Sequence, residues 1–374
     1  MISKPALAAT ALVLAGQSSA QLANAEDAFY TLQGWYNPGS GIWDGDGWWN
    51  GANAFTVVAE LATAAQTKND SSVTQSVTNI FANTWVVGPS SNANLPDSER
   101  TLGQYDSSNS SVWGGPAYDD NGWWALGWIA AYDVTKNETY LELAKGMFDD
   151  LANNAWGTRC GNAGVYWNSD HSYINAITNE LFLSIAAHLA NRVPDNSAYY
   201  IDWAEKEWNW FATSGMINEN NTINDGLTEP CTNNQQTAYS YNQGVVLGGL
   251  VELNKASPNQ SYIDSANTIA QAAIKLMADS NNVIHDTCED EGGCFPNATQ
   301  FKGVFIRNLL LLHQASPNDL YATVIKACAQ STWDNNRDTS TNELSINWAG
   351  PFVSPTNSSA HSSAMEPLIA AIYL

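Results

Sequence analysis

Apolar side chains recur at three- and four-residue spacing along almost the whole chain, and the two-residue alternation of strands is nearly missing. This periodicity is typical of α-helices that turn one face toward a core. We therefore predict an all-α protein of about a dozen helices. Their approximate ranges are 24–36, 48–66, 70–83, 120–134, 137–153, 172–192, 197–213, 236–254, 259–278, 300–315, 318–333 and 360–373.

Two kinds of helix alternate. Residues 137–150 represent the odd-numbered ones, which are amphipathic, with charged side chains opposite the apolar face. Residues 244–250 represent the even-numbered ones, which are apolar or small nearly all round. A helix of the second kind is buried on every side. The pattern predicts an inner ring of buried helices inside an outer ring of amphipathic ones.

The connections alternate as well. Those after even-numbered helices are short, and those after odd-numbered helices are long, over residues 84–119, 154–171, 214–235, 279–299 and 334–359. Antiparallel helices with this rhythm place every long loop at one end. We therefore predict an (α/α)6 barrel in a single domain, residues 21–374, with a ligand cleft at the long-loop face.

Charge narrows the choice of partner. The chain has 374 residues with 37 acidic and 14 basic side chains, a net charge of −23. Such a field repels nucleic acid, anionic lipid and acidic polysaccharide, so a neutral or basic partner is favoured. The chain has few basic residues from which to build the cleft of a lyase for acidic polysaccharides. The 16 Trp exceed the 10 Phe, a surplus often found in sugar clefts.

The N-terminus predicts export. Lys4 precedes a short apolar run, residues 6–16, and small residues allow cleavage after Ala20 or Ala25. The run is too short for a membrane span, and the C-terminus lacks the spacer and tail of a GPI signal. We expect a signal peptide over residues 1–20 and a secreted protein, extracellular or in a cell wall, without membrane anchor and monomeric.

Cysteines and sequons agree with export. Cys288 and Cys294 flank a short loop and are expected to pair, and Cys160 and Cys231 could join two longer loops. Cys328 falls inside a predicted helix and is expected to be a buried thiol. No Cys/His spacing resembles a zinc site, and no metal or cofactor is expected. Potential N-glycosylation sites occur at Asn69, Asn109, Asn137, Asn220, Asn259, Asn297 and Asn357. Glycans at Asn109 and Asn297, in mouth loops, would have to point outward or be missing.

Asp119 and Asp120 are the strongest candidates for chemistry. They stand between glycines and tryptophans where an apolar helix begins. An Asp at such a place is usually an N-cap. One cap needs one Asp, however, and glycoside hydrolysis needs a carboxylate and a carboxylic acid beside the same bond. Adjacent side chains fit the narrow separation of a retaining mechanism better than the wide one of an inverting mechanism.

Other residues of the predicted mouth could either bind substrate or pack in the core. We expect about half of the mouth tryptophans to be structural, with one of each Trp-Trp pair pointing inward. Lys302 and Arg307 open a buried helix and need carboxylate partners. The acidic loop that begins at Glu289 is expected to be a solvated turn. The tryptophans concerned are Trp48, Trp49, Trp113, Trp123, Trp124, Trp167 and Trp348.

Six stretches together resemble glycoside hydrolase family 76, the α-1,6-mannanases, in its fungal secreted branch. They are GWWNGAN at 47–53, YDDNGWW at 118–124, ITNEL at 177–181, YSYNQG at 239–244, FKGVFIR at 301–307 and WAGPF at 348–352. The resemblance implies an (α/α)6 barrel and endo-acting, retaining hydrolysis of α-1,6-mannan or manno-oligosaccharides. It makes Asp119 the nucleophile and Asp120 the general acid/base.

The same stretches supply the residues expected to bind substrate. These are Trp48, Trp49, Asn53, Tyr118, Trp123, Trp124, Trp167, Asn179, Tyr241, Asn242, Gln243, Lys302, Arg307 and Trp348. Two alternatives stay open. A transglycosidase of the same family would re-attach the cut mannan to an acceptor. A non-catalytic mannan-binding wall protein would keep the tryptophans without requiring both aspartates.

Overall fold

The computed structural model describes residues 19–161, 163–290 and 293–374. The signal peptide expected over residues 1–20 therefore lies almost wholly outside the described residues. Each predicted helical range contains a helix, and the described residues form one hydrophobic core. Within these residues no helix is long and apolar enough to cross a membrane.

An inner ring of helices lines the barrel, and each inner helix packs against the next until the last closes on the first. In chain order the ring consists of α2 (Trp48–Thr67), α4 (Tyr118–Thr135), α6 (Ala176–Ala190), α8 (Ser240–Ala256), α11 (Phe301–Ala315) and α13 (Ser358–Ala371). Small residues allow this close packing. A Cβ on Gly244 of α8, for example, would lie 2.6 Å from the Cα of Phe305 in α11.

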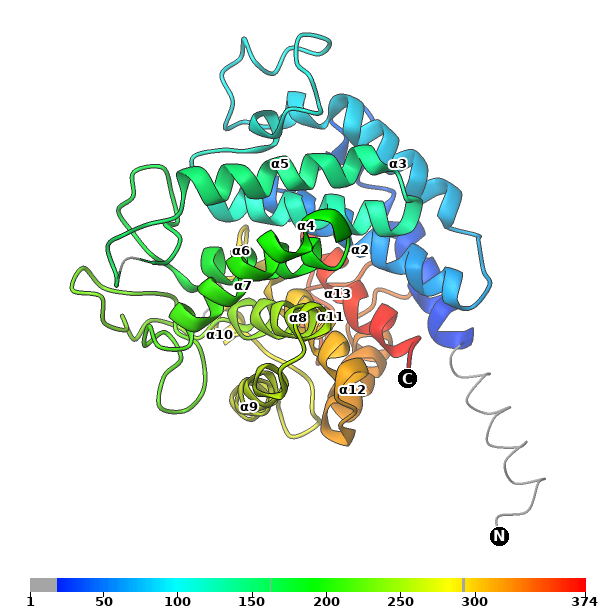
Figure 1. Cartoon of the computed structure of the whole chain (residues 1–374). Helices are drawn as coiled ribbons and strands as arrows, with labels where there is room; N and C mark the ends of the chain where they lie inside the picture. The colour runs from blue at the N-terminus through cyan, green and yellow to red at the C-terminus, as the bar shows by residue number, and fades with distance from the viewer. Residues whose placement is uncertain (1–18, 162, 291–292) are drawn as a thin grey trace.

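An outer ring surrounds the first (Figure 1). It consists of the helical residues 19–32 and of α3 (Thr74–Val87), α5 (Glu138–Asn154), α7 (Ser197–Phe211), α9 (Gln260–Met277) and α12 (Asp319–Asn335). Inner helices such as α6 and α8 are buried along almost their whole length, whereas outer helices such as α9 bury only one face. The two predicted rings and their membership are thus confirmed, and the fold is an (α/α)6 barrel.

The remaining elements are short. A two-stranded hairpin, β1 (Tyr36–Asn37) and β2 (Ile42–Trp43), follows the first helix. The mouth loops contain α10 (Thr287–Asp290) and the 3-10 turns η1 (Gly88–Ser91), η2 (Ser110–Trp113) and η4 (Ala298–Gln300), while η3 (Pro194–Asn196) precedes α7. The sequence pattern did not predict α10, which is a single turn within a loop.

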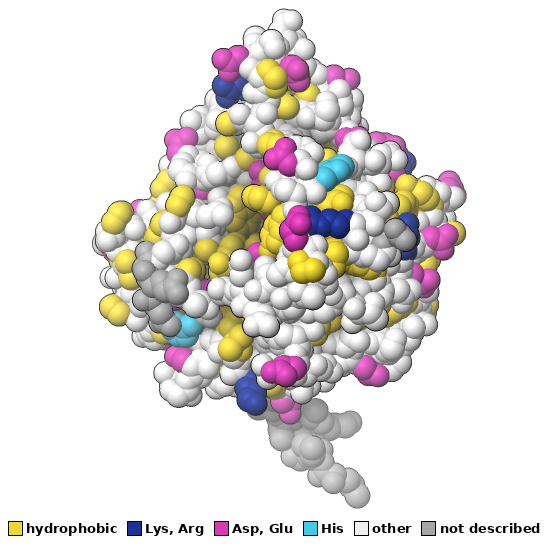
Figure 2. Space-filling model, turned by 90° about the vertical axis from the view of Figure 1, so that its left-hand side faces the viewer, with side chains coloured by type: hydrophobic (Ala, Val, Ile, Leu, Met, Phe, Trp, Pro, Cys, Tyr) yellow, Lys and Arg dark blue, Asp and Glu magenta, His cyan; other side chains and the backbone are white. Residues whose placement is uncertain are grey.

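The long loops lie at one end of the barrel, as predicted. Those after α5 and α7 project to the left in Figure 1. Figure 2 looks onto this mouth and shows hydrophobic side chains gathered around a hollow. Both expected disulfides are present, Cys160–Cys231 and Cys288–Cys294, and Cys328 is a free, buried thiol.

Candidate active site

The first turn of α4 carries Asp119 and Asp120 into the mouth. The helix begins where the chain leaves the extended Ala117, and no side chain caps it. The neighbouring loop fixes this start, because the backbone N–H of Tyr118 donates to the Trp167 carbonyl at 2.7 Å. Neither aspartate serves as the N-cap, so the structural explanation for the pair does not hold.

The two carboxyl groups have different partners. Asp119 Oδ2 accepts a hydrogen bond from Trp167 Nε1 at 3.1 Å, and its Oδ1 accepts one from the Asp120 backbone N–H at 3.1 Å. The side chain of Asp120 is hydrogen-bonded by Asn94. The donors therefore favour a charged Asp119 more strongly than a charged Asp120.

Both carboxyl groups titrate above their usual range. Burial raises the pKa of Asp119 to about 6, although the hydrogen bonds from Trp167 and the backbone lower it. Burial and the neighbouring charge of Asp119 raise the pKa of Asp120 to about 8, and the bond from Asn94 opposes this. At neutral pH the pair then holds one proton, on Asp120. A carboxylate beside a carboxylic acid is the arrangement that a retaining glycosidase needs.

An aromatic wall stands opposite the pair in a cavity of about 130 Å3. Tyr241 stacks on Phe301 with ring centroids 3.8 Å apart and on Trp123 at 6.4 Å. Trp49 packs against Trp123 at 5.7 Å and against Phe301 at 5.9 Å. Trp49, Trp123, Trp167 and Tyr241, all expected to bind substrate, line this cavity. Aromatic faces of this kind pack against the C–H faces of sugars.

A third carboxylate lies near the pair. Asp225 raises the pKa of Asp119 by its charge, and its Oδ2 accepts a short hydrogen bond from the Tyr173 hydroxyl. Asn234 donates to the same hydroxyl at 2.7 Å. Gly226 makes room for this contact, because a Cβ there would lie 2.4 Å from the Tyr173 oxygen. The loops after α5 and α7 thus meet beside Asp119 and Asp120.

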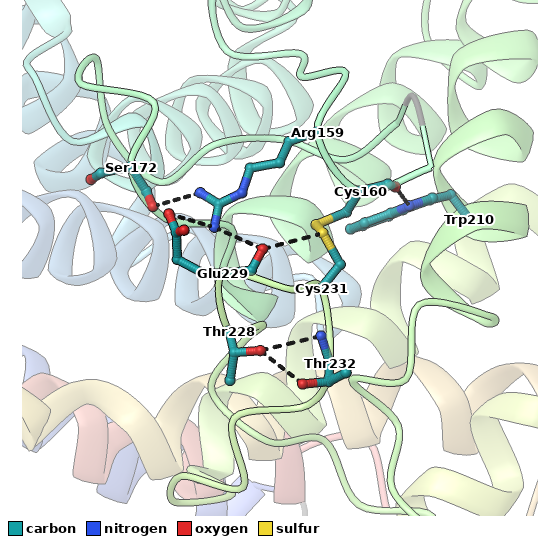
Figure 3. The surroundings of a disulfide bond; sticks show 8 residues. All are labelled: Arg159, Cys160, Ser172, Trp210, Thr228, Glu229, Cys231 and Thr232. Carbon is teal, nitrogen blue, oxygen red and sulfur yellow. Dashed lines mark hydrogen bonds and ion pairs between the residues drawn. A yellow bond between two sulfur atoms is a disulfide. The ribbon is translucent and has the colours of Figure 1, made fainter.

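A disulfide and an arginine join the same two loops farther out (Figure 3). Cys160 of the first loop pairs with Cys231 of the second. Arg159 donates to the carbonyl of Ser172 at 3.0 Å and to that of Glu229 at 3.2 Å. These bonds hold each loop against the other, so the positions of Trp167 and Asp225 depend on both.

Two amides expected to bind sugar hold loops instead. Asn179 of α6 accepts from the Val165 N–H at 2.6 Å and donates to its carbonyl at 2.9 Å. Gln243 of α8 makes the equivalent pair of bonds with Ile223, both at 2.8 Å. Asn242 is also fully buried, and neither polar atom of its side chain has a partner among the described residues.

Several predicted contacts lie away from the cavity. Trp48 and Trp124 pack against each other in the core at 4.6 Å, so one member of each Trp-Trp pair is structural. Trp348 is fully buried, and Lys302 Nζ lies 4.5 Å from its ring centroid. Tyr118 begins α4 and donates to the Asn154 carbonyl at 3.3 Å.

The basic residues of α11 pair with carboxylates other than Asp119 and Asp120. Arg307 pairs with Glu366 at 3.0 Å and makes a short hydrogen bond to Asn53, in a separate cavity deeper in the barrel. Lys302, which is 1% exposed, pairs with Glu289 at 2.8 Å. The expectation of a solvated turn is therefore wrong for Glu289, because a buried ammonium needs a counter-charge; the side chains of Asp290 and Glu291 lie outside the described residues.

The sequence pattern does not predict every residue of the cavity. Phe301 lines the cavity and is the first residue of the run FKGVFIR, from which only Lys302 and Arg307 are predicted to bind substrate. Asp225 had a signal, since an Asp-Gly pair stands in a predicted mouth loop. No sequence signal marks Asn94, because it lies in a long polar loop and contacts Asp120 only once that loop has folded.

The chain is similar to proteins of one known family. The model of the family "Glycosyl hydrolase family 76" matches residues 17–373. The mannan endo-1,6-alpha-mannosidase DFG5 of Candida albicans is 27% identical over 300 residues, which cover 76% of this chain and 62% of that relative. The chain spans about half the length of a further curated relative from Schizosaccharomyces pombe, 48%.

Solved structures share the fold. The Lin0763 protein from Listeria innocua superposes with a TM-score of 0.77 at 23% identity, covering 94% of this chain and 96% of that one. An inactive variant of the α-1,6-mannanase GH76A of Salegentibacter sp. HEL1_6, in complex with α-1,6-mannotriose, gives a TM-score of 0.76 at 16% identity. That match covers 94% of this chain and 99% of the mannanase.

Proposed function

Because this chain belongs to glycosyl hydrolase family 76, we propose that it is a glycoside hydrolase that cleaves α-1,6-mannosidic linkages within mannan, with retention of configuration. One observation carries the proposal: Asp119 and Asp120 share a cavity with an aromatic wall, and their pKa values are separated. The Candida relative is named for the same linkage, and the inactive variant of the Salegentibacter mannanase is in complex with α-1,6-mannotriose.

Asp119 acts as the nucleophile in this mechanism. Its carboxylate attacks the anomeric carbon while Asp120 gives its proton to the glycosidic oxygen, so the bond to the leaving sugar breaks and a mannosyl ester forms. The ionised Asp120 then takes a proton from water. The oxygen of that water attacks the anomeric carbon and breaks the ester, which frees Asp119 as a carboxylate and leaves Asp120 protonated for the next cycle.

The surroundings suit a neutral sugar chain. The wall of Trp49, Trp123, Tyr241 and Phe301 offers stacking surfaces, and Trp167 both lines the cavity and holds Asp119. Mannan is uncharged, so the net charge of −23 on the protein does not repel it. Because one chain supplies the pair and its wall, a monomer has a complete site. Two disulfides fit the oxidising surroundings of an extracellular or cell-wall enzyme.

The test uses linear α-1,6-mannan and time-resolved analysis of the oligosaccharide products. We expect short manno-oligosaccharides from the wild type and a loss of at least about 100-fold in Asp119→Asn and Asp120→Asn. Asp202→Asn, which changes an exposed aspartate of α7, should leave the rate unaltered. A mannoside with a good leaving group should restore the first step, seen as a burst of released leaving group, to Asp120→Asn but not to Asp119→Asn, since such a leaving group needs no acid but still needs the nucleophile.

Two outcomes would redirect the proposal. Products longer than the substrate after addition of an acceptor sugar would indicate transglycosylation, in which the acceptor replaces water. Mannan binding without any cleavage by the wild type would overturn the hydrolase assignment and favour a binding protein.

A further inference from the structure

Asn297 lies where two unrelated features of the chain meet. It lines the catalytic cavity together with Asp119 and Asp120. In the chain it stands at the end of the loop after α9, directly before the turn η4. It is also the acceptor residue of the sequon Asn297-Ala298-Thr299. The first feature points to substrate binding and the second to glycosylation.

The side-chain oxygen of Asn297 is already engaged. Oδ1 accepts a hydrogen bond from Trp49 Nε1 at 2.7 Å, which orients that indole within the aromatic wall. The residue is exposed at the cavity, and Nδ2 has no hydrogen-bond partner among the described residues. Because Oδ1 is occupied, Nδ2 is the free donor of this amide, in a residue that lines the cavity.

The same nitrogen would carry a glycan, so the two uses exclude each other. A glycan attached to the wall of a cavity of about 130 Å3 would cover the catalytic pair. The rest of the sequon has a structural reason of its own. Thr299 is fully buried, and its hydroxyl pairs with that of Ser359 in α13.

The other sequons are placed differently. Asn109, Asn137, Asn259 and Asn357 accept a backbone N–H at the start of a helix or 3-10 turn, and Asn69 and Asn220 stand in exposed or partly exposed turns. None of them lines the catalytic cavity. Asn297 is therefore the sequon at which attachment and catalysis compete.

We propose that Asn297 is a sugar-binding residue of the active site, that its Nδ2 donates to a hydroxyl of the mannan chain, and that the functional enzyme carries no glycan there. This inference rests on the proposed function. Removal of the donor weakens substrate binding, because a sugar hydroxyl that leaves water must find a partner in the site.

Two substitutions separate donation to the sugar from support of Trp49. Asn297→Asp keeps an oxygen for Trp49 Nε1 but replaces the donor with an acceptor. Asn297→Ala removes both. We expect Asn297→Asp to raise KM for manno-oligosaccharides about tenfold, with the melting temperature and Trp fluorescence unchanged. Asn297→Ala should raise KM similarly and alter the fluorescence, and Asn220→Asp, at an exposed sequon, should change neither.

The added charge of Asn297→Asp needs its own check. If it acted only through the catalytic carboxyl groups, the pH profile would shift and KM would recover at another pH. We expect the KM effect at every pH tested. An unchanged KM in Asn297→Asp, with an active wild type, would overturn the inference while leaving the proposed function intact.

Glycan mapping supplies an independent test. The protein is secreted from a glycosylating eukaryotic host, passed over immobilised α-1,6-mannan, and analysed by site-resolved mass spectrometry. We expect the bound, active fraction to be unmodified at Asn297, whatever the occupancy of Asn220. Occupied Asn297 in the fraction that turns over substrate would overturn the inference. A wild type that neither binds nor cleaves mannan would overturn the proposed function as well.

Discussion

Two adjacent aspartates have different protonation states because their side chains meet different elements. Asp119 faces Trp167 and a backbone N–H, which stabilise its negative charge. Asp120 faces that charge itself and has one amide, from Asn94, to offset it. Burial raises the pKa of both, and the unequal donors then separate the two values.

This environment predicts a bell-shaped dependence of kcat/KM on pH. Activity should rise as Asp119 loses its proton near pH 6 and fall as Asp120 loses its proton near pH 8. The Asn94 amide favours the charged form of Asp120, so Asn94→Ala should raise the pKa of Asp120. The alkaline limb should therefore move to higher pH while the acidic limb stays in place.

The control lies in the same loop. Ser98→Ala changes an exposed residue and should leave both limbs unaltered. An alkaline limb that stays in place in Asn94→Ala, at unchanged melting temperature, would show that this amide does not act on Asp120.

Residues in short motifs could be predicted from the sequence, whereas residues in long loops could not. Asp119, Trp49 and Trp123 belong to short runs whose composition already indicates a sugar site, and the cavity brings them together. Asn94 and Asp225 come from long loops, and periodicity says nothing about where a loop folds back. Asn179 and Gln243 carry polar groups typical of sugar binding, yet their partners are loop backbones.

Among the elements, the buried helices were predictable, but the first turns of α6 and α8 were not. Residues 172–175 continue the helical pattern of α6, but Asn175 caps the helix and Ile174 accepts a hydrogen bond from Leu227. Residues 236–239 precede α8 in extended form, and Asp286 binds the N–H of Ser240. Contacts with distant loops override local helix propensity at both places.

The inner helices are also joined at the end opposite the mouth. Arg192, just after α6, donates to Asp133 of α4 at 3.0 Å and to Glu252 of α8 at 3.1 Å. Glu252 is 5% exposed, and although burial raises its pKa, His188, Arg192 and Lys255 outweigh this and hold it at about 2. Its ionised form therefore contributes stability above pH 4.5 that is lost as the pH falls toward 2.

Arg192→Met should lower the free energy of unfolding by about 3 kcal/mol at pH 7, because it leaves the buried Glu252 carboxylate short of a counter-charge. The deficit should shrink toward pH 4, where the variant can protonate Glu252. Lys255→Met removes a partner that is 53% exposed and should cost less than about 1 kcal/mol. Urea denaturation measures both, and equal losses would show that Arg192 is not the central partner.

On the scale of the whole molecule, the barrel divides stability from function. The closed ring of inner helices and the ion pairs at the base hold the fold together. The mouth consists of long loops that meet beside Asp119 and Asp120 and are held by side-chain amides and by Cys160–Cys231. Substitutions of these amides or of this disulfide should therefore change the geometry of the site before they unfold the barrel.

The two disulfides allow this division to be tested. Cys160 and Cys231 are 71 residues apart, so their removal frees a segment that includes α6 and α7, whereas Cys288 and Cys294 are separated by 6 residues. Chain entropy predicts losses of about 4 kcal/mol for Cys160→Ser with Cys231→Ser and about 2 kcal/mol for the shorter loop.

Activity should reveal which part of the molecule the longer cross-link supports. Trp167 and Asp225 sit on the two loops that it joins, so the Cys160→Ser, Cys231→Ser variant should show a raised KM for manno-oligosaccharides. Its far-UV circular dichroism should match the wild type at 25 °C, because the inner ring does not depend on the bond. Loss of helical signal in step with loss of activity would show instead that the mouth loops are needed for the barrel to fold.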